Sequence, residues 1–363
     1  ATGLGLATIS SYLNGGNVRE KNRILIEQAI EELHFEVNEV ARGLKTNRTK
    51  AIGIVIPELN NIFCAEIITE VEDVLRNHGY ATMICDCRTD EKREAEAVEF
   101  LYHRRVDGLL IMPSGKKGTY LQKFTKAGKP VVMIDRKMQE TAGDCVLVDN
   151  EGAARDAVKR LIQAGHTKIG ILAGPEAVYT AEERLRGCEL AFKEGGIPKE
   201  PSLIERGNYT IHGGSQGLRK LAQKNPHMTA VFVSNYEMTL GAIIEANELG
   251  IAIPEKLSII GFDNIEFAKA SIPRLSIVTQ PTREIGKKAA ELMLRRLAEA
   301  KPERKADRKS GMPGDGTPEL EMPSYERSES EALKAEMPEY ETIKLKTSFV
   351  EGKSVKVLEK DRQ

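Results

Sequence analysis

From Ala51 onward, short runs of apolar residues alternate with segments whose apolar residues recur every three or four positions. Most of the apolar runs are bounded by Gly, Pro or Asn, and the amphipathic segments between them commonly end in Gly, as helices do. Continuously apolar strands that alternate with amphipathic helices predict parallel sheets covered by helices on both faces. The predicted strands are AIGIVIP, ATMICDC, LLIMPS, VVMIDR, CVLVDN, IGILAGP, AVFVSN, LSIIGFDN and LSIVTQP.

The predicted strands are too many for one open sheet of ordinary size, so we expect two similar α/β lobes. The first lobe is expected over 51–150 and the second over 151–276. Residues 277–301 should then cross back to the first lobe, and an alternating stretch at about 341–357 should return as a strand to the second. Ligands bind at the carboxyl ends of such strands, which predicts a cleft between the lobes.

Two segments depart from this alternation. Residues 302–340 are rich in Pro, Glu, Ser and Gly and poor in aliphatics, so they cannot bury enough apolar surface to order themselves. We expect a disordered insertion there that acts as a solvated linker, with a regulatory or partner-binding tail as the alternative. Residues 1–35 instead show the pattern of two short helices, which bury little by themselves and suit a small helical module.

Composition narrows the functional classes. A length of 363 residues suits two or three domains, and a net charge of −1 means that any nucleic-acid site must be local. The chain has no apolar run long enough to cross a membrane and no signal-peptide pattern, so we expect a cytoplasmic protein without a membrane partner. Five cysteines without framework spacing and six scattered histidines predict reduced thiols and no metal or other cofactor.

An ordered series of segments along nearly the whole chain outside 302–340 carries a family resemblance. The segments are ATISSYLNGGNVREKNRILIEQAIEELHFEVNEVARGL, NNIFCAEIITEVEDVLRNHGY, RRVDGLLIM, PVVMIDR, AGHTKIGILAGP, ERLRGCELAF, GNYTIHGG, SNYEMTLGAI, IPEKLSIIGFDN and QPTREIGKKAAELML. On these segments the chain resembles the LacI/GalR family of bacterial transcription regulators. The resemblance implies an α/β fold of two doubly wound, periplasmic-binding-protein-like lobes, preceded by a partial helix-turn-helix headpiece at 1–35 and a hinge at 36–50.

The resemblance also exposes a departure at the start of the chain. Family headpieces begin with a helix of the type TIxDVAxxAGVS, whereas this chain starts at ATGLGLATIS. We therefore expect that the headpiece cannot fold stably within this chain, and that DNA binding belongs to the full-length protein.

The candidate DNA-binding residues follow from the resemblance. Leu6, Ala7 and Ser11 occupy base-reading places of the recognition helix, and Thr8 and Ser10 suit phosphate contacts. Leu6 and Ala7 can touch thymine methyl groups but cannot form bidentate hydrogen bonds, so no operator sequence is predicted. Ordinary helix packing explains these two residues equally well.

The hinge carries the stronger indication of DNA binding. Family hinges meet in pairs in the minor groove, where a leucine from each copy wedges between base pairs, and Leu44 occupies that place. Arg42 and Lys45 supply local positive charge for phosphate contacts. A solvated basic linker is the alternative that composition alone favours.

A sugar-like effector needs an aromatic face and charged or amide groups that grip its hydroxyls. Taken singly, several candidates also fit ordinary structural roles: Phe63 as core, Asp135 and Asp263 as helix caps, and Arg184 as a surface ion pair. Taken together, they lie at positions that the resemblance assigns to the effector. The predicted effector-binding residues are Phe63, Asp135, Arg184, Tyr209, Asn235, Asp263 and Gln280.

Two residues alter the wall of this predicted pocket. Cys64 replaces the second aromatic residue common after Phe63, and Tyr236 replaces the Asp usual in the family's NDxM pattern. The identity of the effector therefore does not transfer from the family. Asp, Arg, Asn and Gln side chains together favour a sugar or polyol over a purine.

We therefore expect a homodimeric, sequence-specific DNA-binding regulator, a repressor, controlled by a small sugar-like effector between its lobes. Effector binding would change DNA affinity by a coupling free energy of ~1–3 kcal/mol. A sugar-binding receptor without a DNA function is the alternative, and an enzyme of the doubly wound class is the third hypothesis. Catalysis is not expected, since the sequence has no Gly-rich phosphate loop, no G-x-S-x-G and no convincingly spaced Cys and His pair.

Overall fold

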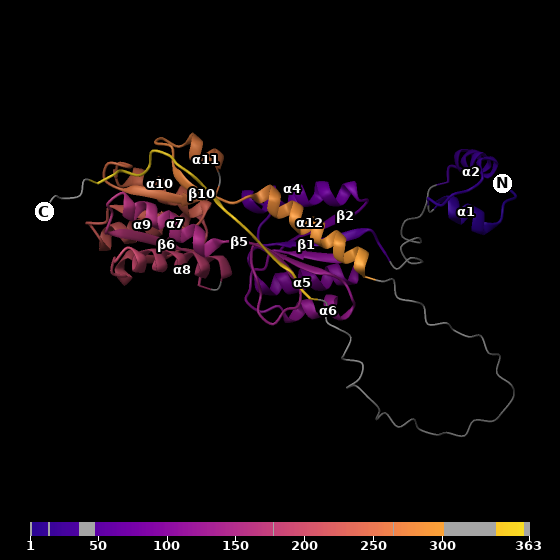
Figure 1. The fold of residues 1–363 in the computed structure, drawn as a ribbon, viewed down its shortest axis with the longest axis horizontal. Coiled ribbons are helices and arrows are strands. Elements are labelled where there is room, and N and C mark those ends of the chain that lie inside the picture. Colours follow the sequence, from indigo (N-terminus) through magenta and orange to yellow (C-terminus); the bar gives the residue numbers. More distant parts are fainter. Residues whose placement is uncertain are drawn as a thin grey trace, which may run out of the picture.

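The computed structural model describes residues 2–13, 15–35, 48–176, 178–263, 265–300 and 339–358. These residues form an N-terminal helix pair and two α/β lobes (Figure 1). The predicted hinge at 36–50 lies outside the described residues except for its last three positions. The predicted insertion at 302–340 lies outside them except for its last two.

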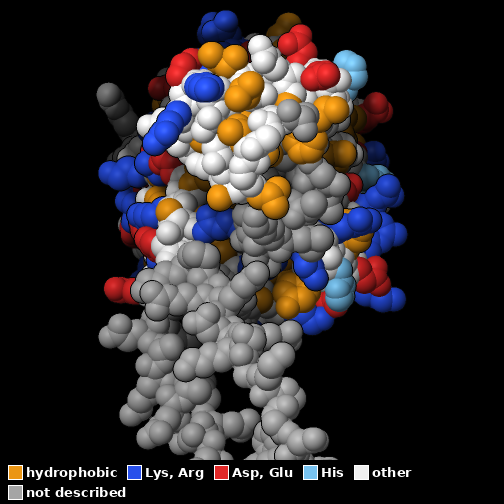
Figure 2. Space-filling model, turned by 90° about the vertical axis from the view of Figure 1, so that its right-hand side faces the viewer, with side chains coloured by type: hydrophobic (Ala, Val, Ile, Leu, Met, Phe, Trp, Pro, Cys, Tyr) orange, Lys and Arg blue, Asp and Glu red, His pale blue; other side chains and the backbone are white. Residues whose placement is uncertain are grey.

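The N-terminal helix pair consists of α1 (Leu6–Leu13) and α2 (Glu20–Glu32). The Tyr12 hydroxyl joins the two helices by donating a hydrogen bond of 2.9 Å to Glu27 Oε1. Within the pair, Ile26 is the one side chain that becomes buried among the described residues. Figure 2 faces this end of the molecule and shows hydrophobic side chains at the surface. Two short helices bury little by themselves, as the sequence predicts.

Lobe 1 is built on a parallel six-stranded sheet with the order β11-β5-β4-β3-β1-β2. Helices α4 (Ile62–Asn77) and α12 (Thr282–Glu299) cover one face. Helices α5 (Glu91–His103) and α6 (Gln122–Lys126), with the 3-10 turn Thr119–Leu121, cover the other. The strands are β1 (Ala51–Ile56), β2 (Ala81–Asp86), β3 (Gly108–Ile111), β4 (Val131–Ile134), β5 (Asp144–Val148) and β11 (Thr342–Leu345).

Lobe 2 repeats this architecture with the strand order β12-β10-β9-β8-β6-β7, except that its edge strand β12 runs antiparallel to β10. Helices α7 and α8 cover one face of its sheet, and α9, α10 and α11 cover the other. The strands are β6 (Ile169–Ala173), β7 (Ile204–Arg206), β8 (Ala230–Val233), β9 (Ser258–Phe262), β10 (Ser276–Thr279) and β12 (Ser348–Val350). The helices are α7 (Asn150–Gln163), α8 (Tyr179–Glu194), α9 (Ile211–Lys224), α10 (Tyr236–Glu248) and α11 (Ile265–Ala270), with a 3-10 turn at Pro201–Leu203.

Both lobes therefore confirm the predicted doubly wound α/β fold. The nearly continuous apolar runs of the sequence become strands that are buried on both faces, and all six residues of β1 are buried. An exception is the edge strand β2, which is mostly exposed because it has a neighbour on one side alone.

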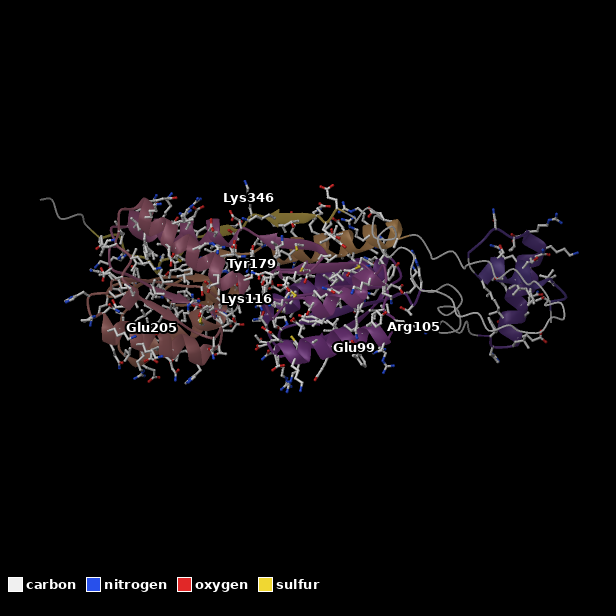
Figure 3. The ribbon with its side chains drawn as sticks, turned by 90° about the horizontal axis from the view of Figure 1, so that it is seen from below. Glu99, Arg105, Lys116, Tyr179, Glu205 and Lys346 are labelled. Carbon is white, nitrogen blue, oxygen red and sulfur yellow. The ribbon has the colours of Figure 1, made fainter. Side chains whose placement is uncertain are left out.

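The prediction for the two segments that cross between the lobes was partly wrong. The sequence predicts the stretch at about 341–357 as a strand of lobe 2, but β11 pairs with β5 in lobe 1 and, of the two, only β12 pairs with β10 in lobe 2. The sequence predicts that the stretch 277–301 crosses back to lobe 1, but β10 belongs to the sheet of lobe 2 and, of the two elements, only α12 packs on lobe 1. Each sheet has a free edge that accepts another strand, and periodicity does not reveal which edge a strand will join. Lys346, between β11 and β12, lies at the crossing between the lobes (Figure 3).

Candidate functional site

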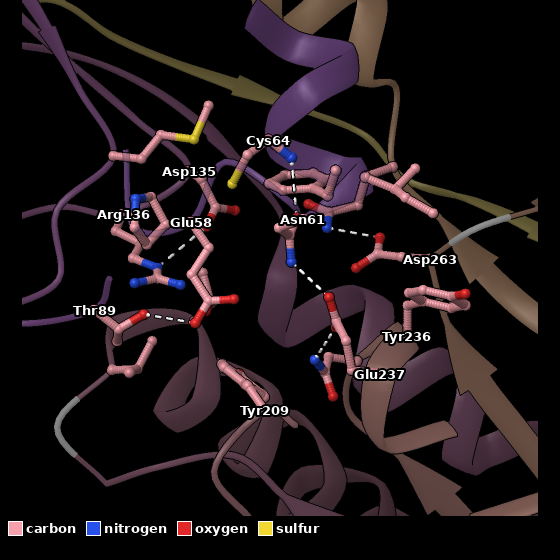
Figure 4. Close-up of a pocket in the computed structure, with 18 of the residues that line it drawn as sticks. Glu58, Asn61, Cys64, Thr89, Asp135, Arg136, Tyr209, Tyr236, Glu237 and Asp263 are labelled. Atoms are coloured by element: carbon pink, nitrogen blue, oxygen red, sulfur yellow. Dashed lines mark hydrogen bonds and ion pairs between the residues drawn. The ribbon is translucent and has the colours of Figure 1, made fainter. Parts of the chain in front are cut away.

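A pocket of about 400 Å³ lies between the two lobes, at the carboxyl ends of their parallel strands (Figure 4). Its walls come from residues that follow β1 and β4 in lobe 1 and β6, β8 and β9 in lobe 2. The fold brings all of the predicted effector residues to this one pocket. They are Phe63 and Asp135 from lobe 1, Arg184, Tyr209, Asn235 and Asp263 from lobe 2, and Gln280 from the crossing segment. That they bind an effector stays a prediction.

Arg184 lies on α8 and is 4% exposed, so it is not the surface ion pair considered above. Its Nε donates to Asn150 Oδ1 at 2.8 Å, and its Nη1 donates to the carbonyl of Ser234 at 2.6 Å. The guanidinium carbon also lies 3.8 Å from the centre of the Phe262 ring. These contacts hold a buried positive charge in one orientation beside the pocket.

Asp263 follows β9 and adopts a left-handed backbone, with φ of 66°. Its Oδ1 accepts a 2.8 Å hydrogen bond from Gln280 Nε2. Burial raises the pKa of Asp263 to about 6, and the nearby Arg184 opposes that rise. The carboxyl is therefore positioned by its neighbours in advance of any ligand.

Asp135 follows β4 and has the same φ of 66°. Its Oδ2 lies 3.4 Å from Arg136 Nε, whose side chain is also anchored by donating from Nη1 to the carbonyl of Pro113. Burial raises the pKa of Asp135, while Arg136 and Arg184 lower it. Unlike Asp263, it has an oxygen, Oδ1, that is buried without a hydrogen-bond partner among the described residues.

Asn61 and Glu237 connect the two lobes across the pocket. Asn61 Nδ2, at the start of α4, donates a 2.6 Å hydrogen bond to Glu237 Oε1 on α10. The other carboxylate oxygen of Glu237 accepts from Asn235 Nδ2 at 2.5 Å. The pKa of Glu237 is raised to about 7, mainly by burial and also by the negative charges of Asp263 and Glu58. Figure 4 shows this bridge between the lobes.

The aromatic walls come from opposite lobes. Phe63 is half-buried on α4 and packs against the core of lobe 1, so a role in the core accounts for part of its surface. Tyr209 has φ of 61° and rests against Gly174, where an added Cβ would lie 2.3 Å from its ring. Glycine at 174 is therefore required for the ring to lie where it does.

The two residues that depart from the family pattern also line the pocket. Cys64 is buried, and burial raises the pKa of its thiol to about 12, so the thiol is protonated and poorly nucleophilic. Tyr236 packs edge-on against Phe267, with ring centroids 5.4 Å apart.

Several residues of the site were missed by the sequence reasoning. Asn61 and Glu237 carry the bridge between the lobes, and Arg136 holds one oxygen of Asp135. Asn61 is recognisable as a helix N-cap before IFCAEII, and its side chain does accept from the Cys64 N–H at 3.0 Å. Nothing local to Glu237 indicates that its carboxylate contacts a residue of the other lobe.

The candidate DNA-binding residues divide into two groups. Leu6, Ala7, Thr8, Ser10 and Ser11 all lie on α1, and Leu6 is 86% exposed. The hinge candidates lie outside the described residues: Arg42, Leu44 and Lys45.

Two features are absent from the described part of the chain. No helix there is long and apolar enough to cross a membrane. No group of three or more His, Cys, Asp and Glu side chains within those same ranges is arranged to hold a metal ion.

Comparison with known proteins gives concordant matches. Residues 49–312 match the family described as periplasmic binding proteins and sugar binding domain of LacI family. The HTH-type transcriptional repressor CytR of Escherichia coli (strain K12) is 34% identical over 289 residues, which cover 79% of this chain and 85% of that protein. The matched relatives are transcriptional regulators rather than enzymes.

Two solved structures extend the match to three dimensions. The complex of the transcriptional regulator CelR with cellobiose superposes with a TM-score of 0.69 at 25% identity, covering 97% of each chain. The lac repressor dimer bound to operator and the anti-inducer ONPF has a TM-score of 0.78, covering 98% of this chain and 96% of that one. Its 21% identity shows a shared fold.

Proposed function

This chain belongs to the LacI family of transcriptional regulators, and we propose that it is a homodimeric repressor whose affinity for operator DNA is set by a small polyhydroxylated effector bound between lobes 1 and 2. The matched proteins include a repressor, CytR, and regulators with an effector domain of the same fold. CelR, one of the structural relatives, is known as a complex with cellobiose.

One observation supports the effector most strongly. Four buried polar atoms of pocket-lining residues have no hydrogen-bond partner among the described residues: Asp135 Oδ1, Arg136 Nε, Tyr209 Oη and Gln280 Oε1. Buried polar groups in proteins are nearly always paired, and an unpaired group commonly meets a ligand or a bound water. These four come from lobe 1, lobe 2 and the crossing segment, and a ligand bound between the lobes would offer them partners. Such a ligand would stabilise one arrangement of the lobes over others.

The described end of the hinge supports a route from this pocket to DNA. The Asp107 carboxylate accepts from the backbone N–H groups of Thr49, at 2.8 Å, and Lys50, at 3.0 Å. Arg48 Nη2 donates to the carbonyl of Leu297, in the last turn of α12, at 2.9 Å. The first residue of α12, Thr282, lines the pocket. A change at the pocket end of this helix would therefore reach the segment that leads to the headpiece.

The experiment measures DNA binding with and without ligand, on protein that carries a complete headpiece. We expect salt-sensitive, sequence-specific binding to DNA upstream of its own gene, by fluorescence anisotropy. A carbohydrate that binds the pocket should shift this affinity, and at a hundredfold excess over Kd it should stabilise the protein by about 2.7 kcal/mol. Absence of specific DNA binding, together with carbohydrate binding, would instead support a sugar-binding receptor without a DNA function.

A further inference from the structure

We propose that this pocket selects a polyhydroxylated ligand without an anionic group, and that Glu237 is the residue that excludes phosphorylated forms of such a ligand. The inference rests on the proposed effector function of the same pocket and narrows the chemical class of the effector. It depends on the charges around the pocket, on the contacts that its two arginines already make within the protein, and on the position of the Glu237 carboxylate.

The charged lining is predominantly acidic. Its carboxylates are Glu58, Glu66, Asp135, Glu237 and Asp263. Among the described residues that line the pocket, Arg136 and Arg184 are the basic ones. A phosphate brought into this pocket would face more negative than positive side chains in a partly desolvated space, where like charges repel strongly.

Both arginines are already anchored to the protein, Arg184 by two hydrogen bonds and Arg136 by one, and the buried Arg136 Nε has no hydrogen-bond partner among the described residues. Arg184 commits Nε and Nη1 to Asn150 and Ser234. Arg136 donates from Nη1 to the Pro113 carbonyl, and its Nε faces Asp135. A phosphate is bound best by the two parallel donors of one free guanidinium edge. Binding a phosphate in that way would compete with these contacts within the protein.

Glu237 occupies a position between two helix N-termini that would otherwise favour the binding of an anion. The N-termini of α4 and α10 face the pocket, and helix N-termini attract anions. Each is capped by an asparagine: Asn61 Oδ1 accepts from the Cys64 N–H, and Asn235 Oδ1 accepts from the Met238 N–H at 3.1 Å. The Nδ2 groups of the same two asparagines then both point to the Glu237 carboxylate. The negative charge that suits the two helix ends is thus supplied by the protein itself.

The asparagine orientations also show why a carboxylate suits position 237. Because each Oδ1 is fixed by its cap, each Nδ2 donates toward residue 237, which therefore needs two acceptor oxygens. Glutamate has two and glutamine has one. The unpaired Asp135 Oδ1 and Gln280 Oε1 are acceptors as well. Hydroxyl or ammonium groups of a ligand supply the missing donors, whereas a phosphate monoester brings mainly acceptors.

The test compares ligands in matched pairs by isothermal titration calorimetry on the full chain, at about pH 8, where Glu237, with its pKa of about 7, is mostly ionised. The pairs are glucose and glucose 6-phosphate, ribose and ribose 5-phosphate, and adenosine and its 5′-monophosphate, with cellobiose, glucosamine and inorganic phosphate as single probes. We expect binding within the unphosphorylated set, with the phosphorylated partner weaker by at least about tenfold, which corresponds to about 1.4 kcal/mol. In Glu237→Gln the ratio of the two dissociation constants, phosphorylated over unphosphorylated, should fall at least about threefold, because the repelling charge is gone.

Two variants separate charge from folding and from the bridge. Glu248→Gln removes the same charge from the exposed far end of α10 and should leave the ratio unchanged. Asn61→Ser keeps an N-cap residue but shortens the bridge to Glu237, so both members of a pair should weaken while their ratio persists. Thermal melts of each variant show whether it is folded.

The outcomes distinguish this inference from the proposed function. A phosphorylated ligand that binds as tightly as its partner, or a panel in which nothing binds, would overturn the selectivity. An unchanged ratio in folded Glu237→Gln would remove Glu237 from that role. Operator binding that responds to a sugar phosphate would leave the repressor function standing and overturn only the inference.

Discussion

The two lobes place an aspartate at the same point of the same fold. Asp135 follows β4 in lobe 1 and Asp263 follows β9 in lobe 2, and these strands hold equivalent places in the two sheet orders. Both residues have φ of 66°, and each donates its backbone N–H to the next strand, to Val146 at 2.9 Å and to Val278 at 2.7 Å. Asp tolerates this left-handed backbone better than most residues. The architecture alone therefore puts one carboxylate on each side of the pocket.

The neighbours make the two carboxylates different. Asp263 Oδ1 is already held by Gln280, whereas Asp135 Oδ1 has no hydrogen-bond partner among the described residues. The same fold element thus gives one acceptor that is satisfied before a ligand arrives and one that is left open. We infer that Asp135 contributes more to ligand affinity and that Asp263 contributes more to the shape of the empty pocket.

Removing Arg184 should have the largest effect, because this residue opposes the raised pKa of both aspartates. Arg184→Ala leaves Asn150 Oδ1 and the Ser234 carbonyl without their donor and leaves buried carboxylates without a nearby cation. We expect a loss of about 3 kcal/mol in the free energy of unfolding, measured with urea, and no detectable ligand binding by calorimetry.

The matched control for that variant lies two residues along the same helix. Arg186 is about half exposed and pairs with Glu151 and Glu183. Arg186→Ala should change stability by less than about 1 kcal/mol and leave ligand affinity intact. Equal effects of the two substitutions would show that Arg184 has no special part in the pocket.

Replacing each aspartate by asparagine tests the difference between the lobes directly. Asparagine adopts the same left-handed backbone, and in Asp263→Asn the side-chain carbonyl would still accept from Gln280. Asp135→Asn removes a charged acceptor that a ligand hydroxyl would use, so affinity should fall about tenfold to a hundredfold. Asp263→Asn should lower ligand affinity about threefold to tenfold, because the hydrogen bond of this side chain is already made within the protein. A larger loss from Asp263→Asn would reverse the assignment.

The smallest expected effect is a dependence on pH with opposite signs for stability and affinity. The pKa of Glu237 is raised from 4.5 to about 7, and that of Asp263 from 3.8 to about 6. The folded protein therefore binds more protons than the unfolded chain between about pH 4 and pH 7. The contribution of these two groups to the stability of the ligand-free protein should fall across this window as pH rises, and the loss is complete above the folded pKa values.

Ligand affinity should instead rise across the same window, because ionised carboxylates accept hydroxyl donors better than protonated ones do. Glu237→Gln should flatten the upper part of the stability curve, as measured by thermal melts from about pH 5 to pH 8. Parallel curves for the variant and the unchanged protein would mean that Glu237 is not the group that titrates.

Much of the fold could be predicted because its elements are local. The apolar runs and amphipathic segments from Ala51 onward encode burial on one or two faces, and the doubly wound lobes follow from their alternation. The pocket position follows from the same rule, since carboxyl ends of parallel strands gather at one edge of each sheet. For that reason the seven candidate residues, chosen by family position, all reach one pocket, while their role in binding stays a prediction.

The sequence by itself determined which segments are strands and helices, because that information is periodic and local. Only the tertiary structure decided that β11 and β12 join different sheets, since either sheet had an open edge. It also decided that Asn61 and Glu237, 176 residues apart, meet across the lobes, and that Gln280 satisfies Asp263 rather than Asp135. These pairings depend on the distance between surfaces that come together after the lobes form, and no spacing along the chain records that distance.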